Sequence, residues 1–374
     1  MGPFIKSKNE TNKMMLHLFI ALIPIIIFAI YKNGYIPYSH DKIDFLTMFY
    51  PLFFITVGAV TSFTIETLYF LIMKQKDHIK NSYSIFPGLL LSLILPLNIP
   101  IYILVVGVII ASLSKIIFEK IGNKIFNPVL IGYILILIIF ANSFTNNNYL
   151  NSYEFDMIPE GTPLNNSLLI NGIGNYETLV EPYGSLLDFF IGIVPGSIGT
   201  TSALLCIIAY LYLSFTKTIK WKIPLVYVGT VFIINYAIGG LLGQGIYYPL
   251  FQILSCGLIF GAVFIATDPF TSTVTSIGQI LQGIFLGILT ILFRFIGIES
   301  IALSILIMNL FVPLIDKIGA KSRFNFNKSI LIFVIAWILV IIVCFVIAFS
   351  KRTFNNTNIN HGYMKHENNN YFLK

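Results

Sequence analysis

The chain has 374 residues, of which 56% are hydrophobic and only 10% charged, and its mean hydropathy is +0.85. Soluble domains carry roughly 25% charged residues, so the composition excludes a soluble protein and predicts an all-α polytopic membrane protein in contact with the lipid bilayer. The net charge of +7 comes from basic residues grouped in short loops, which indicates membrane orientation and no nucleic-acid partner.

Apolar segments follow one another along the chain, and several are short or interrupted by glycine and proline. In chain order they cover residues 14–31, 45–73, 85–96, 99–117, 126–141, 200–215, 223–240, 247–266, 278–296, 300–315 and 330–350. The segment 85–96 ends at Pro96 and is too short to span alone unless it is tilted or partly re-entrant. We therefore predict about 10–11 transmembrane segments, with broken or half helices among them.

Basic residues are placed as the positive-inside rule requires for a cytoplasmic N-terminus. Groups of them precede the first segment and follow the second, fourth, sixth and tenth, and Lys115 is counted in the group after the fourth. Lys32 and Lys42 are exceptions in the first outer loop. The interval from Lys124 to Lys217 contains no other basic residue, and its acidic loop is predicted to lie outside the cytoplasmic membrane.

Four parts are predicted along the chain. Residues 1–141 form a first membrane repeat of about five segments, and residues 142–199 form the outer loop with a re-entrant segment. Residues 200–325 form a second membrane repeat, and residues 326–374 add a span and a polar tail. Loops as long as the outer one are uncommon unless they are functional, although a plain solvated loop is the alternative.

The stretch "FFIGIVPGSIGTTSALLC" predicts a broken helix. Pro195 and Gly196 interrupt an apolar run, and Gly199 and Thr200 follow the interruption. A break at membrane depth frees backbone groups that protein, water or a ligand must satisfy. The half-helix that follows presents free N–H donors to an anion or an electron-rich ring edge, and the alternative is a packing kink.

Two halves of the chain echo each other weakly. "SIFPGLLLSLILP" is followed one span later by "IFNPVLIG", and "CGLIFGAVFIATDP" is followed later by "MNLFVPLID". Paired irregularities of this kind suggest two internal repeats with a binding site near the middle of the membrane.

Few ionisable residues lie in or near the spans. Asp268 is predicted either to cap the turn at Pro269 or to position a ligand or ion. Asn127, before a proline, is either a turn former or a hydrogen-bond donor at a broken helix. Arg294 and Glu299 are interpreted as interfacial anchors.

Other site classes find no support in the sequence. The histidines are scattered, the cysteines lie in apolar runs, and there is no hydrolase, phosphate-loop or metal-binding motif. No cysteine set is spaced for an iron–sulfur cluster, so the chain is not a complete redox enzyme alone.

Five stretches form an ordered set along the chain: "FIKSKNETNKMMLHLFIALIP", "KIFNPVLIG", "PGSIGTTSALL", "FIATDPFTS" and "MNLFVPLID". Together they resemble the RnfD/NqrB family of membrane subunits, and RnfD more closely. This family belongs to ion-pumping ferredoxin:NAD and NADH:quinone oxidoreductase complexes. The matching stretches occur in order from about residue 4 to residue 325, and each is weak by itself.

The resemblance implies FMN joined through its phosphate to a threonine hydroxyl. In "DMIPEGTPL", Asp156 falls on the acidic position of the attachment motif, Thr162 on the acceptor and Pro163 on the usual sequel. Three positions depart from the motif: Pro159 replaces Ser or Thr, Glu160 replaces Gly, and Gly161 replaces Ala.

The remaining site assignments also follow from the resemblance. Broken segments at Gly196, Ser197, Thr200 and Asn127 are expected to line the flavin ring, Asp268 is a further candidate, and Phe189 and Phe190 could stack on the ring or simply pack. A second, non-covalent riboflavin is implied, and no matched motif places it.

The resemblance predicts a flavin-carrying electron-transfer subunit of an Rnf complex in a bacterial cell membrane, coupled to Na⁺ or H⁺ translocation, with the flavin on the outer side. Its partners are the other Rnf subunits, which carry iron–sulfur and flavin groups. The alternatives are a small-solute channel or transporter of similar fold, and a degenerate subunit without flavin. The tail after residue 350 is either a docking anchor or a disordered appendage.

Overall fold

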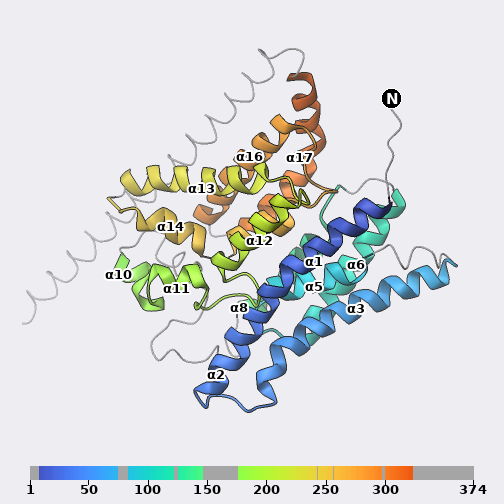
Figure 1. The fold of residues 1–374 in the computed structure, drawn as a ribbon, viewed down its shortest axis with the longest axis horizontal. Helices are drawn as coiled ribbons and strands as arrows, with labels where there is room; N and C mark the ends of the chain where they lie inside the picture. The colour runs from blue at the N-terminus through green and yellow to red at the C-terminus, as the bar shows by residue number, and fades with distance from the viewer. Residues whose placement is uncertain are drawn as a thin grey trace, which may run out of the picture.

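All regular elements in the described part of the chain are helical, which confirms the all-α class (Figure 1). The structure is a computed structural model. It describes residues 8–74, 83–121, 125–145, 176–241, 243–255, 257–296 and 300–322. The predicted span 330–350, the polar tail and residues 146–175 of the outer loop lie outside these ranges.

Within the described residues, six helical stretches are long and apolar enough to cross a membrane, which confirms a polytopic membrane protein. They are Lys13–Ser39, Thr47–Ile72, Ile101–Lys120, Lys222–Gly240, Ser276–Ile296 and Ile301–Ala320. The elements that form them are α1 (Lys8–Ile30), the π-helical turn η1 (Tyr31–Tyr35) and α2 (Ile36–Ser39), the turn η2 (Thr47–Phe49) with α3 (Tyr50–Ile72), α6 (Ile101–Ile121), α13 (Lys222–Leu241), α16 (Ser276–Ile296) and α17 (Ser300–Ser322).

Four of the predicted apolar segments are short or bent instead of full straight crossings. Three are α5 (Ile85–Ile94), α7 (Pro128–Ile139) and α12 (Ala203–Phe215), with 10, 12 and 13 residues. The fourth joins α14 (Tyr247–Leu254) to α15 (Leu258–Phe260) and the π-turn η4 (Gly261–Ile265) with a bend of 60°. The described chain therefore offers six or seven full spans, and with the short and bent segments it accounts for the predicted segments other than 330–350, which lies outside the described residues. The predicted broken helices are confirmed.

The remaining elements lie on either side of the undescribed outer loop. They are α8 (Ala141–Thr145), α10 (Tyr176–Leu179), the turn η3 (Glu181–Tyr183) and α11 (Leu186–Ile191). The last of these leads into the predicted break before α12.

Two groups of helices repeat the same order of packing. In the first, α3 packs on α5 and α6, and α6 packs on α7; in the second, α13 packs on α14 and α16, and α16 packs on α17. The short helices α5 and α14 each end on an extended residue with ψ 147°, at Leu95 and Ser255. This correspondence supports the division into two membrane repeats that we propose. In Figure 1 the groups lie in different parts of the molecule, and α1 meets α12 while α7 meets α17.

Glycines bring neighbouring helices into backbone contact. A Cβ on Gly88 of α5 would lie 2.0 Å from the carbonyl oxygen of Gly58 on α3. A Cβ on Gly132 of α7 would lie 2.6 Å from the carbonyl oxygen of Gly107 on α6. Small residues at helix interfaces permit such approach in membranes, where dispersion contacts replace the hydrophobic effect as the driving force.

Candidate functional site

The break between α11 and α12 runs from Gly192 to Ser202. Gly192 ends α11 in the left-handed region (φ 104°), and its N–H donates to the Asp188 carbonyl at 2.7 Å. A Cβ there would lie 2.6 Å from Cα of Ser202, so glycine is required by both conformation and space. Ser202 caps α12 by accepting from the Leu205 N–H at 3.3 Å. The predicted interruption at Pro195 is confirmed.

The start of α11 is fixed by a capping box. Asp188 accepts from the Ser185 N–H at 2.7 Å and from the Ser185 hydroxyl at 2.8 Å. These hydrogen bonds to the charged form lower the pKa of the Asp188 carboxyl. The carboxylate is therefore engaged in its own turn.

Neighbours on two sides satisfy the backbone groups that the break frees. The N–H groups of Ile198 and Gly199 donate to the carbonyls of Leu95 (3.1 Å) and Leu93 (2.9 Å) at the end of α5. On the other side, carbonyl groups of the break accept hydrogen bonds from side chains of η1. This arrangement meets the requirement that non-helical backbone at membrane depth find partners within the protein.

Hydroxyl groups gather where the break meets the bend in α14–α15. Ser197 and Thr200 hydrogen-bond to each other. A Cβ on Gly257, which has φ 67°, would lie 2.6 Å from Cβ of Thr200, so the bend approaches the break closely. Ser255 at the end of α14 is fully buried, and its Oγ has no hydrogen-bond partner among the described residues. These hydroxyls have the donor and acceptor character that the polar edge of a flavin ring needs.

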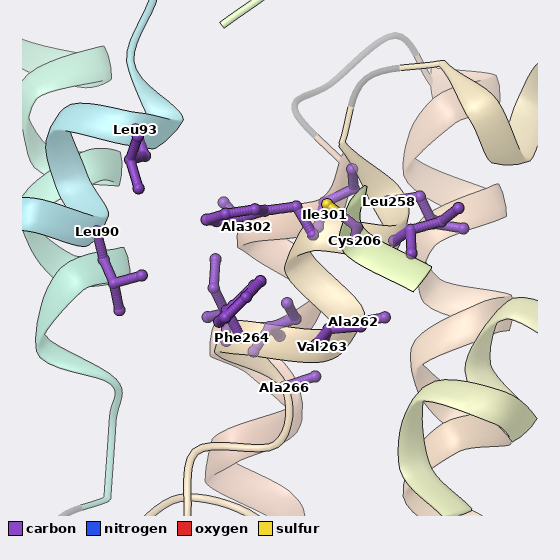
Figure 2. Packing of buried hydrophobic residues seen from close by; sticks show 14 of the residues in the cluster. Leu90, Leu93, Cys206, Leu258, Ala262, Val263, Phe264, Ala266, Ile301 and Ala302 are labelled. Atoms are coloured by element: carbon purple, nitrogen blue, oxygen red, sulfur yellow. The ribbon is translucent and has the colours of Figure 1, made fainter. Parts of the chain in front are cut away.

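Apolar side chains surround this region. Leu90 and Leu93 of α5 project towards the part of the core that holds Phe264 and Ala302 (Figure 2). Phe189 is fully buried and packs edge-on against Tyr183 and Phe251, so the packing interpretation of Phe189 is the one observed. Phe190 is half-buried against the same core.

The structure brings Asn127 and Asp268 together, although 141 residues separate them. The Asn127 side-chain amide donates to Asp268 Oδ2 at 3.1 Å, while its Oδ1 accepts from the Val129 N–H at 3.0 Å and caps α7. Asp268 Oδ1 accepts from the Phe270 N–H at 3.1 Å, as the turn-capping interpretation requires.

Asn309 of α17 joins Asn127 and Asp268, and we call these three residues the asparagine cluster. In the amide orientation that satisfies both of its groups, Asn309 of α17 donates to the Ile305 carbonyl at 3.1 Å. Its oxygen then accepts from the Asn127 N–H at 3.2 Å. The weakly echoing motifs "IFNPV" and "MNLFVP" therefore meet through their asparagines.

Replacing Asn127 with alanine should destabilise the protein by about 1 kcal/mol, because α7 loses its N-terminal cap and Asp268 loses a donor. Thermal unfolding of the purified protein in detergent measures the change. Asn127→Ser keeps a capping oxygen and should be affected less. Equal destabilisation by serine and alanine would contradict a capping role.

Lys220 and Asp316 organise the loop that follows Asp268, and the sequence did not single them out as site residues. Lys220 Nζ donates to the Ser272 carbonyl (2.9 Å) and hydroxyl (2.8 Å). Asp316 accepts from the N–H groups of Val274 and Thr275, each at 2.9 Å. Burial lowers the pKa of Lys220, and the negative charges of Asp316 and Asp268 oppose that shift.

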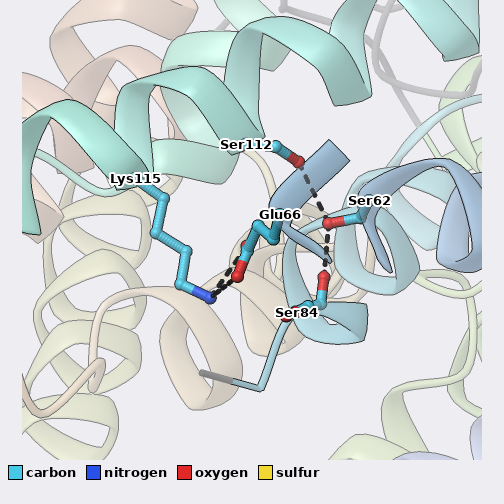
Figure 3. Close-up of polar contacts among 5 residues, drawn as sticks. All are labelled: Ser62, Glu66, Ser84, Ser112 and Lys115. Carbon is cyan, nitrogen blue, oxygen red and sulfur yellow. Dashed lines mark hydrogen bonds and ion pairs between the residues drawn. The ribbon is translucent and has the colours of Figure 1, made fainter. Parts of the chain in front are cut away.

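A buried ion pair joins α3 to α6 and was also missed. Lys115 Nζ lies 2.9 Å from both carboxylate oxygens of Glu66, and the two side chains are only 10% and 1% exposed (Figure 3). Nearby, Ser62 donates to the Ser84 carbonyl and lies 3.1 Å from the Ser112 hydroxyl. Lys115, which we counted with a cytoplasmic loop group, therefore lies inside the helix bundle.

Arg294 is another correction. We expected an interfacial anchor, but the side chain is 5% exposed in α16. Its Nη1 donates to the Gln252 carbonyl and, at 2.8 Å, to the Gln252 side-chain oxygen. The last carbonyls of α14 have no helical partner beyond the bend, and a guanidinium satisfies such groups. Glu299 lies outside the described residues.

The predicted attachment site is not part of the described structure. Asp156, Gly161, Thr162 and Pro163 all lie outside the described residues and stay predictions. The structure therefore describes only the membrane side of the expected flavin site, at Gly196, Ser197 and Thr200.

Comparison with known proteins gives matches along most of the chain. The profile of the NQR2, RnfD, RnfE family matches residues 1–325. The D subunit of the proton-translocating ferredoxin:NAD(+) oxidoreductase complex of Clostridium ljungdahlii is 32% identical over 334 residues, covering 87% of this chain and 96% of that protein. The D subunit of the Na(+)-translocating ferredoxin:NAD(+) oxidoreductase complex of Acetobacterium woodii is 31% identical, covering 87% and 95%. The B subunit of the Na(+)-translocating NADH-quinone reductase of Chromohalobacter salexigens is 35% identical over 159 residues, covering 40% of this chain and 38% of that protein.

Proposed function

Because the chain belongs to the NQR2, RnfD, RnfE family, we propose that it is the D subunit of an Rnf-type ion-translocating ferredoxin:NAD oxidoreductase and carries FMN on Thr162. The observation that carries the assignment to Rnf is the extent of the match. It reaches 96% and 95% of two ferredoxin:NAD oxidoreductase D subunits, but only 38% of the NADH-quinone reductase protein.

Thr162 would hold the cofactor through a phosphoester, with Asp156, Gly161 and Pro163 completing the recognition motif. Gly196, Ser197 and Thr200 would contact its polar edge, since the break offers hydroxyls there. Bound there, the flavin supplies one- and two-electron redox chemistry that no side chain of the protein provides.

The protein's own residues supply position and environment. The hydrogen bonds from the break to Leu93 and Leu95 fix the backbone at the proposed site. Val194 and Ile198 of the break are buried in the apolar core, whereas Gly196, Ser197 and Thr200 are half-buried. Asn127 and Asp268 hold the start of α7 and the loop after η4 in one arrangement, and we propose that they position the membrane side of the site.

The chain acts with partner subunits, because it has no cysteine set for an iron–sulfur cluster and no nucleotide-binding loop. We propose that it lies in a bacterial cell membrane with the flavin loop outside, as the distribution of lysines supports. Electron transfer through it would be coupled to movement of Na⁺ or H⁺.

Deleting the chain from cells that hold the complete complex should reduce ferredoxin-dependent NAD⁺ reduction by membranes to background. Complementation with the full-length chain should restore the activity. Membranes that retain the activity without this chain would contradict the assignment.

The duplicated order of helix packing also fits a small-solute transporter, since repeats with broken helices are common in that class. That alternative predicts solute flux into proteoliposomes containing the chain alone, with Thr162 unmodified. A degenerate subunit would assemble with the complex and carry no flavin.

A further inference from the structure

A lysine that the proposed function leaves unused holds the break between α11 and α12. Lys32 belongs to the π-turn η1 inside the apolar stretch Lys13–Ser39, and its Nζ donates to the Val194 carbonyl at 2.6 Å. An ammonium group has three donors, and this is the one hydrogen bond found for it among the described residues. A charged side chain inside a membrane span is costly and marks a functional position unless it is paired.

No carboxylate pairs with Lys32 within the described residues. The ion pair found there joins Lys115 to Glu66 in other helices. Asp188, in the first turn of α11, accepts hydrogen bonds from the backbone and side chain of Ser185. No described acidic side chain therefore pairs with the protonated form of Lys32.

The charge is also fixed in place at the break. Asn33, the next residue of η1, donates to the Ala29 carbonyl at 3.0 Å and to the Ile198 carbonyl at 3.5 Å. Lys32 and Asn33 thus hold the two ends of the stretch from Val194 to Ile198, which contains Pro195 and Gly196. Single π-turns inside helices occur frequently at functional sites.

We propose that Lys32 supplies the positive charge that raises the midpoint potential of the flavin held at the break. This inference rests on the proposed function. Reduction places negative charge on the N1–C2=O edge of a flavin ring, and charge near N1 is one means by which proteins tune the cofactor. A cation beside the break favours the reduced state, because it attracts the negative charge that reduction places on the ring.

Lys32 acts only through its charge, so no bond forms or breaks at its nitrogen. The ligand chemistry that it favours is the polar, electron-rich edge of a redox ring. The hydroxyls of Ser197 and Thr200 lie in the same break, hydrogen-bonded to each other. If Lys32 served only to satisfy the Val194 carbonyl, one N–H donor would be enough. Its other two N–H donors have no hydrogen bond among the described residues.

The test is a redox titration of purified full-length protein that was produced together with the flavin-attaching enzyme. Dithionite supplies the electrons, and flavin absorbance reports the midpoint potential. Lys32→Gln keeps a donor for the Val194 carbonyl and removes the charge, so its potential should fall. Lys32→Arg keeps the charge and should stay near the wild-type value.

Lys42→Gln is the matched control, because Lys42 is exposed in the loop that follows the helical stretch containing Lys32. Removing its screened charge should leave the potential unchanged. In-gel fluorescence of every variant measures flavin attachment separately from the potential.

Two results would overturn the inference alone: a flavinylated Lys32→Gln variant with the wild-type potential, or equal shifts in the glutamine and arginine variants. A wild-type protein that carries no flavin would overturn the proposed function and the inference with it. A lower potential in Lys32→Gln, with Lys32→Arg and Lys42→Gln unchanged, is the supporting result.

Discussion

Replacing Thr162 with alanine should abolish covalent flavin completely, because the methyl side chain has no hydroxyl with which to form the phosphoester. The measurement is fluorescence of the denatured protein in a gel, after production together with the flavin-attaching enzyme. Denaturation removes any flavin held without a covalent bond. The fluorescent band of the wild-type protein should therefore be absent from the Thr162→Ala lane.

Ser167→Ala is the matched control, since it removes a hydroxyl from the same loop and should leave the band unchanged. Persistent fluorescence in Thr162→Ala would place the attachment elsewhere. A wild-type band without fluorescence would instead indicate the degenerate subunit. The departures from the attachment motif at Pro159 and Glu160 would then explain the missing flavin. Mass spectrometry of the peptide containing Thr162 distinguishes these cases.

Neutralising one partner of the Glu66–Lys115 pair should destabilise the protein by about 3–5 kcal/mol. The pair is almost fully buried, so either Glu66→Gln or Lys115→Met leaves the other charged group without its counter-ion. The double variant Glu66→Leu/Lys115→Met removes both charges and should be destabilised less than either single variant. Thermal unfolding in detergent measures all three.

Lys120→Met is the control for this experiment, because Lys120 lies on the same helix and is exposed. Its removal should change stability by less than about 1 kcal/mol. Additive losses in the double variant would show that the two charges are not coupled.

Breaks in the helices could be predicted from the sequence, because proline and glycine act locally. Pro195 and Gly196 lie in the irregular segment, and Leu95 before Pro96 is extended, as the residue before a proline prefers. The number of full crossings could not be predicted in this way. A half-length helix is as apolar per residue as a full span, and only its packing shows where it ends.

The candidate site was predicted in part. Asn127 and Asp268 were found because each adjoins a proline in an irregular segment, and the structure joins them. The sequence did not predict the contacts of three basic residues: Lys32, Arg294 and Lys115. Their partners lie 162, 42 and 49 residues away along the chain. Charge patterns along a chain report topology, whereas these contacts depend on which helices become neighbours.

The asparagine cluster at the start of α7 has a mechanical consequence. Asn127 binds Asp268 through its side chain and Asn309 through its backbone N–H, so one helix end is tied to two later segments. If one helix group rotated against the other, these hydrogen bonds would either break or lie at the axis of the rotation. The cluster is therefore one of several connections that resist such a motion, together with the hydrogen bonds from Ile198 and Gly199 to the end of α5 and the contact of α1 with α12.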